Sequence, residues 1–316
     1  MAKAVILDAG SLGENVDLSP LTRLPFTWKI HHHTQPHEVI ERIEEATVVL
    51  SNKVCLRETH LMVAKSLKMI AVLATGTNNI DLKTAHDRGI LVSNARNYST
   101  ESVVEHTLRL MMALAGNLSA YQKDVKEGAW SLTPFFCLLS HPIVELRRRL
   151  LTIVGYGHQG QRLKTIAQAL GMNVEIAARP GHPSSEQRRP LEELLPLTDV
   201  LSFHCPLTPE TENLLNRTNI FKLKKGAFVI NCARGGIVNE EALVEVLNEG
   251  HLGGAGIDVL SVEPPPPSHP FWGVKHPNFI VTPHMAWGSQ TSRQKLVEET
   301  ATNITSFLSG SHRNQV

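Results

Sequence analysis

The sequence has little cysteine, few aromatic residues and no excess of charge of either sign. Only 4 of its 316 residues are Cys, and 5% are aromatic. Lys and Arg number 31 against 30 Asp and Glu, so the formal net charge is +1 and offers no electrostatic footprint for binding nucleic acid. An apolar fraction of 42% with so little net charge excludes a largely disordered chain. The composition therefore predicts a folded protein that binds no nucleic acid.

Long apolar runs and paired cysteines are also missing. The longest apolar runs, such as Leu110–Ala115, fall well short of the ~20 residues that a membrane-spanning helix needs, so we expect no membrane association. Met1–Asp8 lacks the features of a secretory signal, and we interpret His31–His33 as a polar loop or strand. The cysteines form no CxxC pair, which argues against zinc or disulfides and predicts a reduced, cytoplasmic protein without a bound metal. They are Cys55, Cys137, Cys205 and Cys232.

The length and the hydrophobic pattern predict two α/β domains. A chain of 316 residues exceeds what one core usually supports. Short apolar runs alternate with longer amphipathic segments, as parallel sheets covered by helices require. The first series has strands at 4–7, 47–50 and 69–73, with helices at 37–46 and 58–67. The second has strands at 150–154, 174–177, 199–203, 227–231, 255–259 and 279–282, with helices at 161–170 and 240–248.

Two further helices and two helix ends can be predicted. Glu101–Gly116 is apolar on most of its surface, which predicts a buried helix between the two cores. Gln290–Leu308 has the pattern of an amphipathic helix. Gly171 stands where a left-handed residue ends a helix, and Asn239 is a plausible N-cap.

The most informative local motif is Gly155-Tyr156-Gly157-His158-Gln159-Gly160, which follows a predicted strand and opens a predicted helix. In this motif the first glycine permits a tight turn, the second lets the backbone approach a pyrophosphate, and the third lets the helix pack against the strand. The pattern predicts a dinucleotide site at the helix N-terminus. About 20 residues further on, where an acidic residue usually binds the ribose, the chain reads Ala177-Ala178-Arg179-Pro180.

Several motifs, in this order and spacing, resemble the NAD(P)-dependent D-2-hydroxyacid dehydrogenases. The resemblance covers nearly the whole chain and is greatest to the glycerate dehydrogenase/hydroxypyruvate reductase branch. Besides the glycine motif, it rests on the segments at 74–81 (ATGTNNID), 101–107 (ESVVEHT), 204–208 (HCPLT), 231–235 (NCARG), 256–259 (GIDV), 263–264 (EP) and 282–284 (TPH).

This resemblance implies a fold, a domain division and an assembly. We expect two doubly wound parallel-sheet domains, with a Rossmann-type NAD(P)-binding domain at 99–286 inserted into a flavodoxin-like substrate-binding domain at 1–98 and 287–316. The family places its active site in the cleft between such domains. It also implies a homodimer through the cofactor domain, with Glu101–Gly116 and Leu118–Gly128 as the candidate surface.

Three residues are the catalytic candidates, and each follows a predicted strand of the second series. The Arg234 guanidinium suits fork-like binding of a carboxylate and a keto oxygen. His284 suits proton transfer near neutral pH. Glu263 matches the family's carboxylate partner, and a carboxylate beside an imidazole favours its protonated form. Without the family pattern, Glu263 would be interpreted as a solvated loop residue.

The resemblance also implies binding residues. For substrate these are Lys53, Ala74, Thr75, Gly76, Arg234 and Trp287; Lys53 has the alternative of being a solvated surface lysine, and the bulk of Trp287 favours a small acid. For the cofactor they are Gly155, Gly157, His158, Gln159, Gly160, Ala178, Arg179, Thr107, Cys205, Pro206, Cys232, Ala233 and Asp258.

Two departures from the family pattern carry further expectations. Glycines that the family usually has near Arg148 and Thr152 are replaced here, which predicts an altered turn without loss of the fold. Ala178 would neither bind ribose hydroxyls nor repel a 2′-phosphate, and Arg179 beside it could pair with that phosphate, so we expect NADP(H) to be favoured over NAD(H).

The expected function is reduction of hydroxypyruvate or glyoxylate to D-glycerate or glycolate. Alternatives are a phosphoglycerate dehydrogenase or other D-2-hydroxyacid dehydrogenase, and a non-catalytic cofactor-sensing regulator of the same fold. The intact Arg234, Glu263 and His284 argue against the regulator. A formate or phosphite dehydrogenase is disfavoured, because formate enzymes resembling this family have Gln where Glu263 stands.

Overall fold

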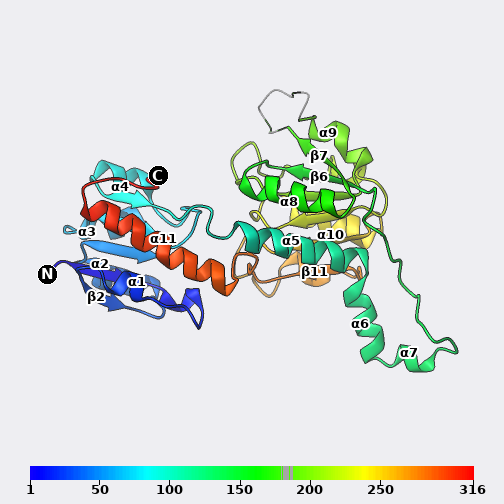
Figure 1. The fold of residues 1–316 in the computed structure, drawn as a ribbon, viewed down its shortest axis with the longest axis horizontal. Helices are drawn as coiled ribbons and strands as arrows, with labels where there is room; N and C mark the ends of the chain where they lie inside the picture. Colours follow the sequence, from blue (N-terminus) through cyan, green and yellow to red (C-terminus); the bar gives the residue numbers. More distant parts are fainter. Residues whose placement is uncertain (179, 181–184, 186–187) are drawn as a thin grey trace. The chain divides into compact units, whose positions relative to one another are not determined.

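Two sheets of parallel strands organise the chain (Figure 1). The computed structural model describes residues 1–178, 180, 185 and 188–316. The first unit comprises Met1–Ser99 and Trp287–Val316, and the second comprises Thr100–Ala286. Arg179 lies outside the described residues, so its predicted contact with a cofactor phosphate has no structural counterpart here.

The five strands of the first unit lie in the order β2-β1-β3-β4-β5, and all of them are parallel. This is the flavodoxin-like order, as predicted. The predicted strands are present within one residue, and two strands were not predicted: β2 and β5. The bounds are β1 Lys3–Ile6, β2 Thr27–Ile30, β3 Val48–Ser51, β4 Met69–Val72 and β5 Leu91–Ser93.

Alternating side chains of these strands build two cores, one on each face of the sheet. Ala4 and Ile6 belong to one core, and Val5 and Leu7 belong to the other. Because both faces are covered, the strands are continuously apolar rather than alternating. The first core is completed by α11 (Gln290–Leu308), drawn in red in Figure 1, and the second by α2, α3 and α4. The shorter helices are α1 Ser19–Thr22, α2 Val39–Ile43, α3 Glu58–Val63 and α4 Leu82–Asp87.

The six strands of the second unit lie in the order β11-β10-β9-β8-β6-β7. Beyond β7, Arg189 forms a parallel bridge to Ala177, with hydrogen bonds from Ala178 N to Arg189 O and from Arg189 N to Ile176 O. Counting this bridge as a rudimentary third strand gives the order 3-2-1-4-5-6-7, which is the Rossmann order 3-2-1-4-5-6 with β11 added beside β10, so the predicted fold class is confirmed. The bounds are β6 Leu150–Val154, β7 Asn173–Ala177, β8 Val200–Phe203, β9 Phe228–Asn231, β10 Gly254–Ile257 and β11 Phe279–Val281.

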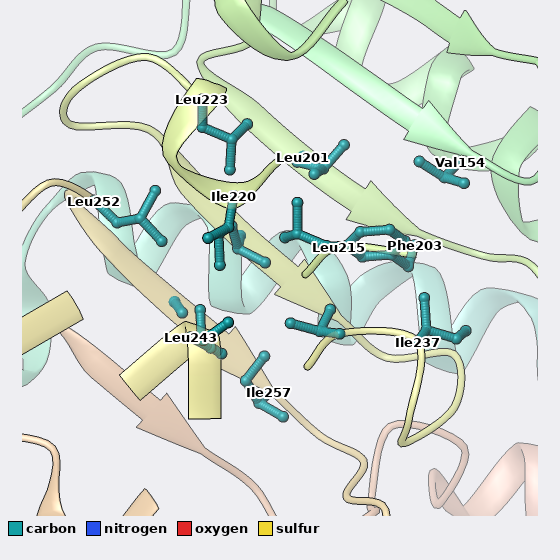
Figure 2. Packing of buried hydrophobic residues seen from close by; sticks show 14 of the residues in the cluster. Val154, Leu201, Phe203, Leu215, Ile220, Leu223, Ile237, Leu243, Leu252 and Ile257 are labelled. Atoms are coloured by element: carbon teal, nitrogen blue, oxygen red, sulfur yellow. The ribbon is translucent and has the colours of Figure 1, made fainter. Parts of the chain in front are cut away.

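Helices cover both faces of this second sheet. Figure 2 shows one face, where Phe203 and Ile257 from the strands pack with Leu243 from α10 (Glu240–Asn248). On the other, α5 (Thr100–Ala115) packs against α8 (His158–Ala169), β9 and β10. The predicted helix ends are confirmed: Gly171 has a φ of 76°, and the Asn239 side chain accepts a hydrogen bond from Ala242 N. The remaining helices are α6 Leu118–Lys126, α7 Ala129–Leu132 and α9 Leu191–Leu194.

The helix α5, predicted to be apolar on most of its surface and buried, has one exposed line of residues along its length. Along α5, Glu101, Glu105, Arg109 and Met112 are exposed, and Arg109 pairs with Glu105 at 2.9 Å. Apolar residues make up little more than half of the helix, and the exposed line is formed mostly by its charged residues. Its other faces are largely buried, and the helix packs against β9 and β10 of the second sheet.

The two replaced glycines have different structural outcomes. Arg148 keeps the left-handed backbone that a glycine would favour, with a φ of 65°, and its N–H donates to Gly171 O at 2.8 Å. Thr152 is fully buried, and its hydroxyl lies 2.6 Å from that of Thr198, which donates to Leu194 O. The altered turn that was predicted is thus not seen at Arg148, because its backbone adopts a conformation that glycine favours. At Thr152 the added hydroxyl is hydrogen-bonded.

Candidate active site

Two glycines of the glycine motif lie where no side chain fits. Gly155 has a φ of 101°, and a Cβ there would lie 2.5 Å from the carbonyl carbon of His204. A Cβ on Gly160 would lie 2.2 Å from Gly155 O. Any larger residue would force apart the β6–α8 turn and the segment after β8. These contacts match the turn and packing roles that the sequence predicted for the first and third glycines.

Gly157, the middle glycine, is different because no described residue packs against the position that its Cβ would occupy. A Cβ there would meet no atom within 4 Å, and the residue is exposed. It is the N-cap of the 12-residue helix α8, and no side chain caps that helix. An uncapped helix start with an open approach fits an anionic diphosphate, which N–H groups and the helix dipole would bind. The residues present therefore fit a dinucleotide cofactor.

Other predicted cofactor residues lie at the carboxyl ends of the neighbouring strands. Cys205 follows β8, and Cys232 and Ala233 follow β9; all three are buried. Burial raises the pKa of the Cys232 thiol to about 12, so it is protonated and a poor nucleophile at neutral pH. Thr107 on α5 is also buried and hydrogen-bonds to Cys232. Open α/β sheets bind ligands at this end of their strands.

Glu263 and His284 form a direct hydrogen bond. His284 Nδ1 lies 2.6 Å from Glu263 Oε2, and Leu260 N donates to Glu263 Oε1 at 2.9 Å. Both side chains are partly exposed, at 26% for His284 and 30% for Glu263. One ring nitrogen is thus occupied by the carboxylate while Nε2 remains on the opposite side of the ring. This is the arrangement of a histidine whose tautomer and orientation are fixed by a carboxylate.

The backbone of His284 is in a left-handed conformation that non-glycine residues rarely adopt. Its φ is 49°, and its N–H contacts both Asp258 O at 2.8 Å and Thr282 O at 2.9 Å. Met285 N and Ala286 N donate to the two carboxylate oxygens of Asp258, each at 2.9 Å. A conformation that costs about 1–3 kcal/mol persists only where its surroundings enforce it. The turn that carries His284 is therefore tightly held.

Arg234 follows β9 in a turn that packs directly against the Glu263 loop. Asn231 closes the turn, accepting from Ala233 N at 3.0 Å and donating to Arg234 O at 2.8 Å. A Cβ on Gly235 would lie 1.9 Å from Leu260 O, so only glycine allows this approach. The turn that holds Arg234 and the loop that leads to Glu263 consequently share one rigid contact.

Glu240 is a support of the site that the sequence did not reveal. Its carboxylate accepts from Ser261 N at 2.7 Å and Ser261 Oγ at 2.8 Å, and it lies 3.2 Å from His269 Nε2. Ser261 and His269 flank Glu263 in the chain, so one carboxylate fixes both ends of that loop. The sequence placed Glu240 only in the first turn of a helix, where acidic residues are common for another reason.

In the first unit, the loop of Lys53 is held by a second residue that the sequence did not reveal. Asp8 is buried and accepts from Asn52 N at 2.9 Å, Lys53 N at 2.7 Å and Val54 N at 3.3 Å. Lys53 itself is exposed. The loop is thus rigid, although its lysine lies at the surface.

Apart from Arg234, the other predicted substrate residues also lie in the first unit. The turn at Ala74–Gly76 is tied to the strand β5 region, because Thr75 Oγ1 donates to Ala95 O at 2.8 Å. Trp287 packs edge-on against Tyr98, with ring centroids 6.4 Å apart. Among the residues that the structure describes, no group of three or more His, Cys, Asp or Glu could hold a metal ion, and no helix is long and apolar enough to cross a membrane.

Comparisons with known proteins agree with this geometry. Residues 108–286 match the family model for the NAD binding domain of D-isomer specific 2-hydroxyacid dehydrogenases. The chain is 37% identical to a glycerate dehydrogenase of Methylorubrum extorquens, over 99% of this chain and 98% of that protein. It is 38% identical to a hydroxypyruvate reductase of Blautia hydrogenotrophica, over 90% of this chain and 88% of that protein.

A solved structure extends the agreement to three dimensions. The D-lactate dehydrogenase of Aquifex aeolicus, solved with NAD and lactic acid, superimposes with a TM-score of 0.80 at 27% identity, covering 98% of this chain and 96% of that one. The predicted resemblance is therefore confirmed. The chain belongs to the D-isomer specific 2-hydroxyacid dehydrogenases, a family of NAD(P)-dependent oxidoreductases.

Proposed function

We propose that the preferred reaction is reduction of hydroxypyruvate or glyoxylate to D-glycerate or glycolate. The observation that carries the proposed chemistry is the 2.6 Å contact between His284 Nδ1 and Glu263 Oε2. The glycerate dehydrogenase and hydroxypyruvate reductase relatives, which match nearly the whole chain, support the substrate class. Trp287, with its bulk, favours a small acid over a phosphorylated one.

Each of the three catalytic candidates has a distinct part in this proposal. When bound, the nicotinamide cofactor supplies the hydride. The Arg234 guanidinium binds the carboxylate and the keto oxygen of the acid in a fork and polarises the carbonyl. Glu263 holds the imidazole at Nδ1, and His284 donates the proton from Nε2 to the new alkoxide oxygen. In the oxidative direction His284 takes that proton back as a base.

The experiment is a kinetic panel with the purified wild-type protein. Oxidation of NADH and NADPH is followed with hydroxypyruvate, glyoxylate, pyruvate and 3-phosphohydroxypyruvate. We expect the highest kcat/KM with hydroxypyruvate or glyoxylate, and reverse oxidation of D-glycerate but not L-glycerate. A preference for the phosphorylated acid would make the protein a phosphoglycerate dehydrogenase instead. Cofactor binding without turnover of any acid would favour the regulator.

We also propose that NADP(H) is favoured over NAD(H). Ala178 follows β7, where a carboxylate would accept the ribose hydroxyls and repel a 2′-phosphate. The test compares kcat/KM for NADPH and NADH in the wild type and in Ala178→Asp. We expect NADPH to be preferred several-fold and the substitution to reverse the preference. A wild-type preference for NADH would contradict this proposal and leave the reaction itself unaffected.

A homodimer through the second unit is the proposed assembly, in a reduced, cytoplasmic setting. Many exposed apolar side chains lie along the chain segment that contains α6 and α7, and exposed apolar residues in such number favour an interaction site. Sedimentation should give a dimer at micromolar concentration, and Leu118→Glu should weaken it. A monomeric wild type would contradict the assembly. The exposed apolar residues are Met112, Leu118, Val125, Trp130, Leu132, Phe135, Phe136, Leu139 and Ile143.

A further inference from the structure

Two polar side chains of α5 contact the turn that carries His284. Ser102 Oγ donates to Ala286 O at 2.7 Å, and His106 Nε2 lies 3.0 Å from Thr282 Oγ1. Ser102 and His106 are four residues apart, so they lie one above the other on the same face of the helix. One helix face thus holds both ends of the segment from Thr282 to Ala286.

The direction of these hydrogen bonds follows from the number of protons on Thr282. Its hydroxyl has one proton, which it donates to Asp258 Oδ1 at 2.5 Å. The hydroxyl oxygen must therefore accept from His106, whose Nε2 carries a proton. Burial lowers the pKa of His106, so the ring is neutral near pH 7 and Nε2–H is its donor. The chain runs from His106 through Thr282 to Asp258.

Asp258 connects the Thr282 hydroxyl to the backbone of the turn that carries His284. Its carboxylate is 1% exposed, and besides the Thr282 hydroxyl it accepts from Met285 N and Ala286 N. The helix can approach because β10 has a glycine at this level: a Cβ on Gly256 would lie 3.0 Å from Leu110 Cβ on α5. The brace is thus built from a helix face, a hydroxyl and a buried carboxylate.

We propose that Ser102 and His106 are positioning residues for the acid/base chemistry of His284, an inference that rests on the proposed function. His284 has a left-handed backbone, a conformation of low intrinsic stability that enforced contacts must maintain. Ser102 and His106 supply these contacts at the two ends of the turn, and neither needs to touch the substrate. Loss of the brace lets the turn relax, and the imidazole then leaves its productive orientation toward the alkoxide oxygen.

The experiment compares His106→Leu, which removes the donor, with His106→Gln, whose amide N–H₂ can replace Nε2–H. We expect His106→Leu to lower kcat up to about 10²-fold, the effect of a displacement of roughly 1 Å, while the Kd for NADPH is unchanged. His106→Gln should restore most of kcat. Ser102→Ala should lower kcat, as His106→Leu does, and Ser102→Thr, which keeps the hydroxyl, should restore it. A matched control is His251→Leu, which removes a histidine donor 2.8 Å from Leu223 O in the same unit and should leave kcat unchanged.

A measurement on the protein without substrate or cofactor separates positioning from loss of stability. Amide hydrogen exchange at Met285 and Ala286 should speed up in His106→Leu and stay slow in His106→Gln and His251→Leu. Unchanged kcat in His106→Leu, or a Gln variant as poor as Leu, would overturn the inference. If the wild type reduces no 2-keto acid, the proposed function fails, and exchange at Met285 and Ala286 still decides whether His106 holds the turn.

Discussion

Each unit of this enzyme holds a loop at the carboxyl end of its sheet with a buried aspartate from the neighbouring strand. After β1, Asp8 accepts three backbone N–H groups of the loop that follows β3. After β10, Asp258 accepts two N–H groups of the turn that follows β11. The same element therefore appears in both units, at the loop of Lys53 and at the turn of His284.

The two loops differ in what the aspartate has to enforce. No residue from 51 to 54 has a positive φ, whereas His284 does, and the Asp258 carboxylate is in turn braced by Thr282 and α5. In the proposed function, Lys53 would bind a charge through a flexible ammonium, for which a relaxed loop suffices. His284 would transfer a proton from a planar ring in a fixed direction, for which a strained and braced turn is needed. The extra supports mark the turn of the second unit as the one whose geometry matters most.

The largest expected effect is on kcat, and it distinguishes the His284 turn from the Lys53 loop, where a substitution should change KM instead. His284→Ala should lower kcat by about 10²–10⁴-fold, the usual contribution of general acid–base catalysis. Lys53→Ala should raise KM for the acid with little change in kcat, as expected for uniform binding. Steady-state kinetics with NADPH and hydroxypyruvate measure both. An equal loss of kcat in the two variants would remove the distinction between the loops.

Acid should destabilise the second unit through His204, a half-buried residue whose Nδ1 atom is buried and has no hydrogen-bond partner among the described residues. Burial lowers the pKa of His204 to about 4, below its ordinary 6.5, so the unfolded chain takes up the proton first. The stabilisation is complete above pH 6.5 and is lost as the pH falls toward about 4, in total about 3 kcal/mol.

The measurement is the free energy of unfolding in urea near about pH 7 and about pH 5, in the wild type and in His204→Gln. The variant should lose less stability between the two pH values than the wild type. Amide exchange should locate the wild-type loss in the second unit. A variant with the same pH dependence as the wild type would show that His204 is not the titrating group.

Arg234→Lys tests whether an ammonium group, such as that of Lys53 in the first unit, can replace the Arg234 guanidinium in the second. A point charge cannot reproduce a bidentate fork. Each lost hydrogen bond to a charged group is worth roughly 1.5–3 kcal/mol, so kcat/KM for the acid should fall about 10–150-fold. Near wild-type efficiency would mean that Arg234 needs only its charge, and the two cations would then be equivalent.

The smallest effect concerns Arg148, another non-glycine residue of the second unit with a left-handed backbone. It precedes β6 and has no part in the proposed chemistry, so Arg148→Gly should relieve strain and stabilise the fold by up to about 1 kcal/mol, the glycine entropy offsetting part of the gain. Urea unfolding and kcat are the measurements. A destabilised variant would contradict this account of Arg148, and His284→Gly, by contrast, should abolish most of the activity.

Buried parallel strands could be predicted from the sequence nearly to the residue, because burial on both faces leaves continuous apolar runs. The strand β2 could not, since Thr27, Lys29 and Ile30 are exposed and no run marks them. The strand β5 has only three residues, which is too short for a periodic signal. The predicted pairing of Glu263 with His284 depended on motif spacing, which records the chemistry of a family.

The supports of the site were beyond sequence reasoning. Asp8 binds a loop 44 residues away, and Ser102 binds a carbonyl 184 residues away. Such bonds join a side chain to a backbone group that every residue has, so the partner cannot be predicted from the residue types. His106 was visible as part of a motif, but its partner Thr282 becomes apparent only when α5 lies against β10.

The insertion of the second unit between two segments of the first also fixes an order of events during synthesis. Leu296, Val297, Ala301 and Ile304 of α11 fill the same core as Ala4 and Ile6 of β1. The residues of the whole second unit are therefore synthesised before those that close the first core. Domains generally fold as units while the chain emerges, with the N-terminal one first. Here the core of the N-terminal sheet can be completed only after α11, the last helix of the chain, has been synthesised.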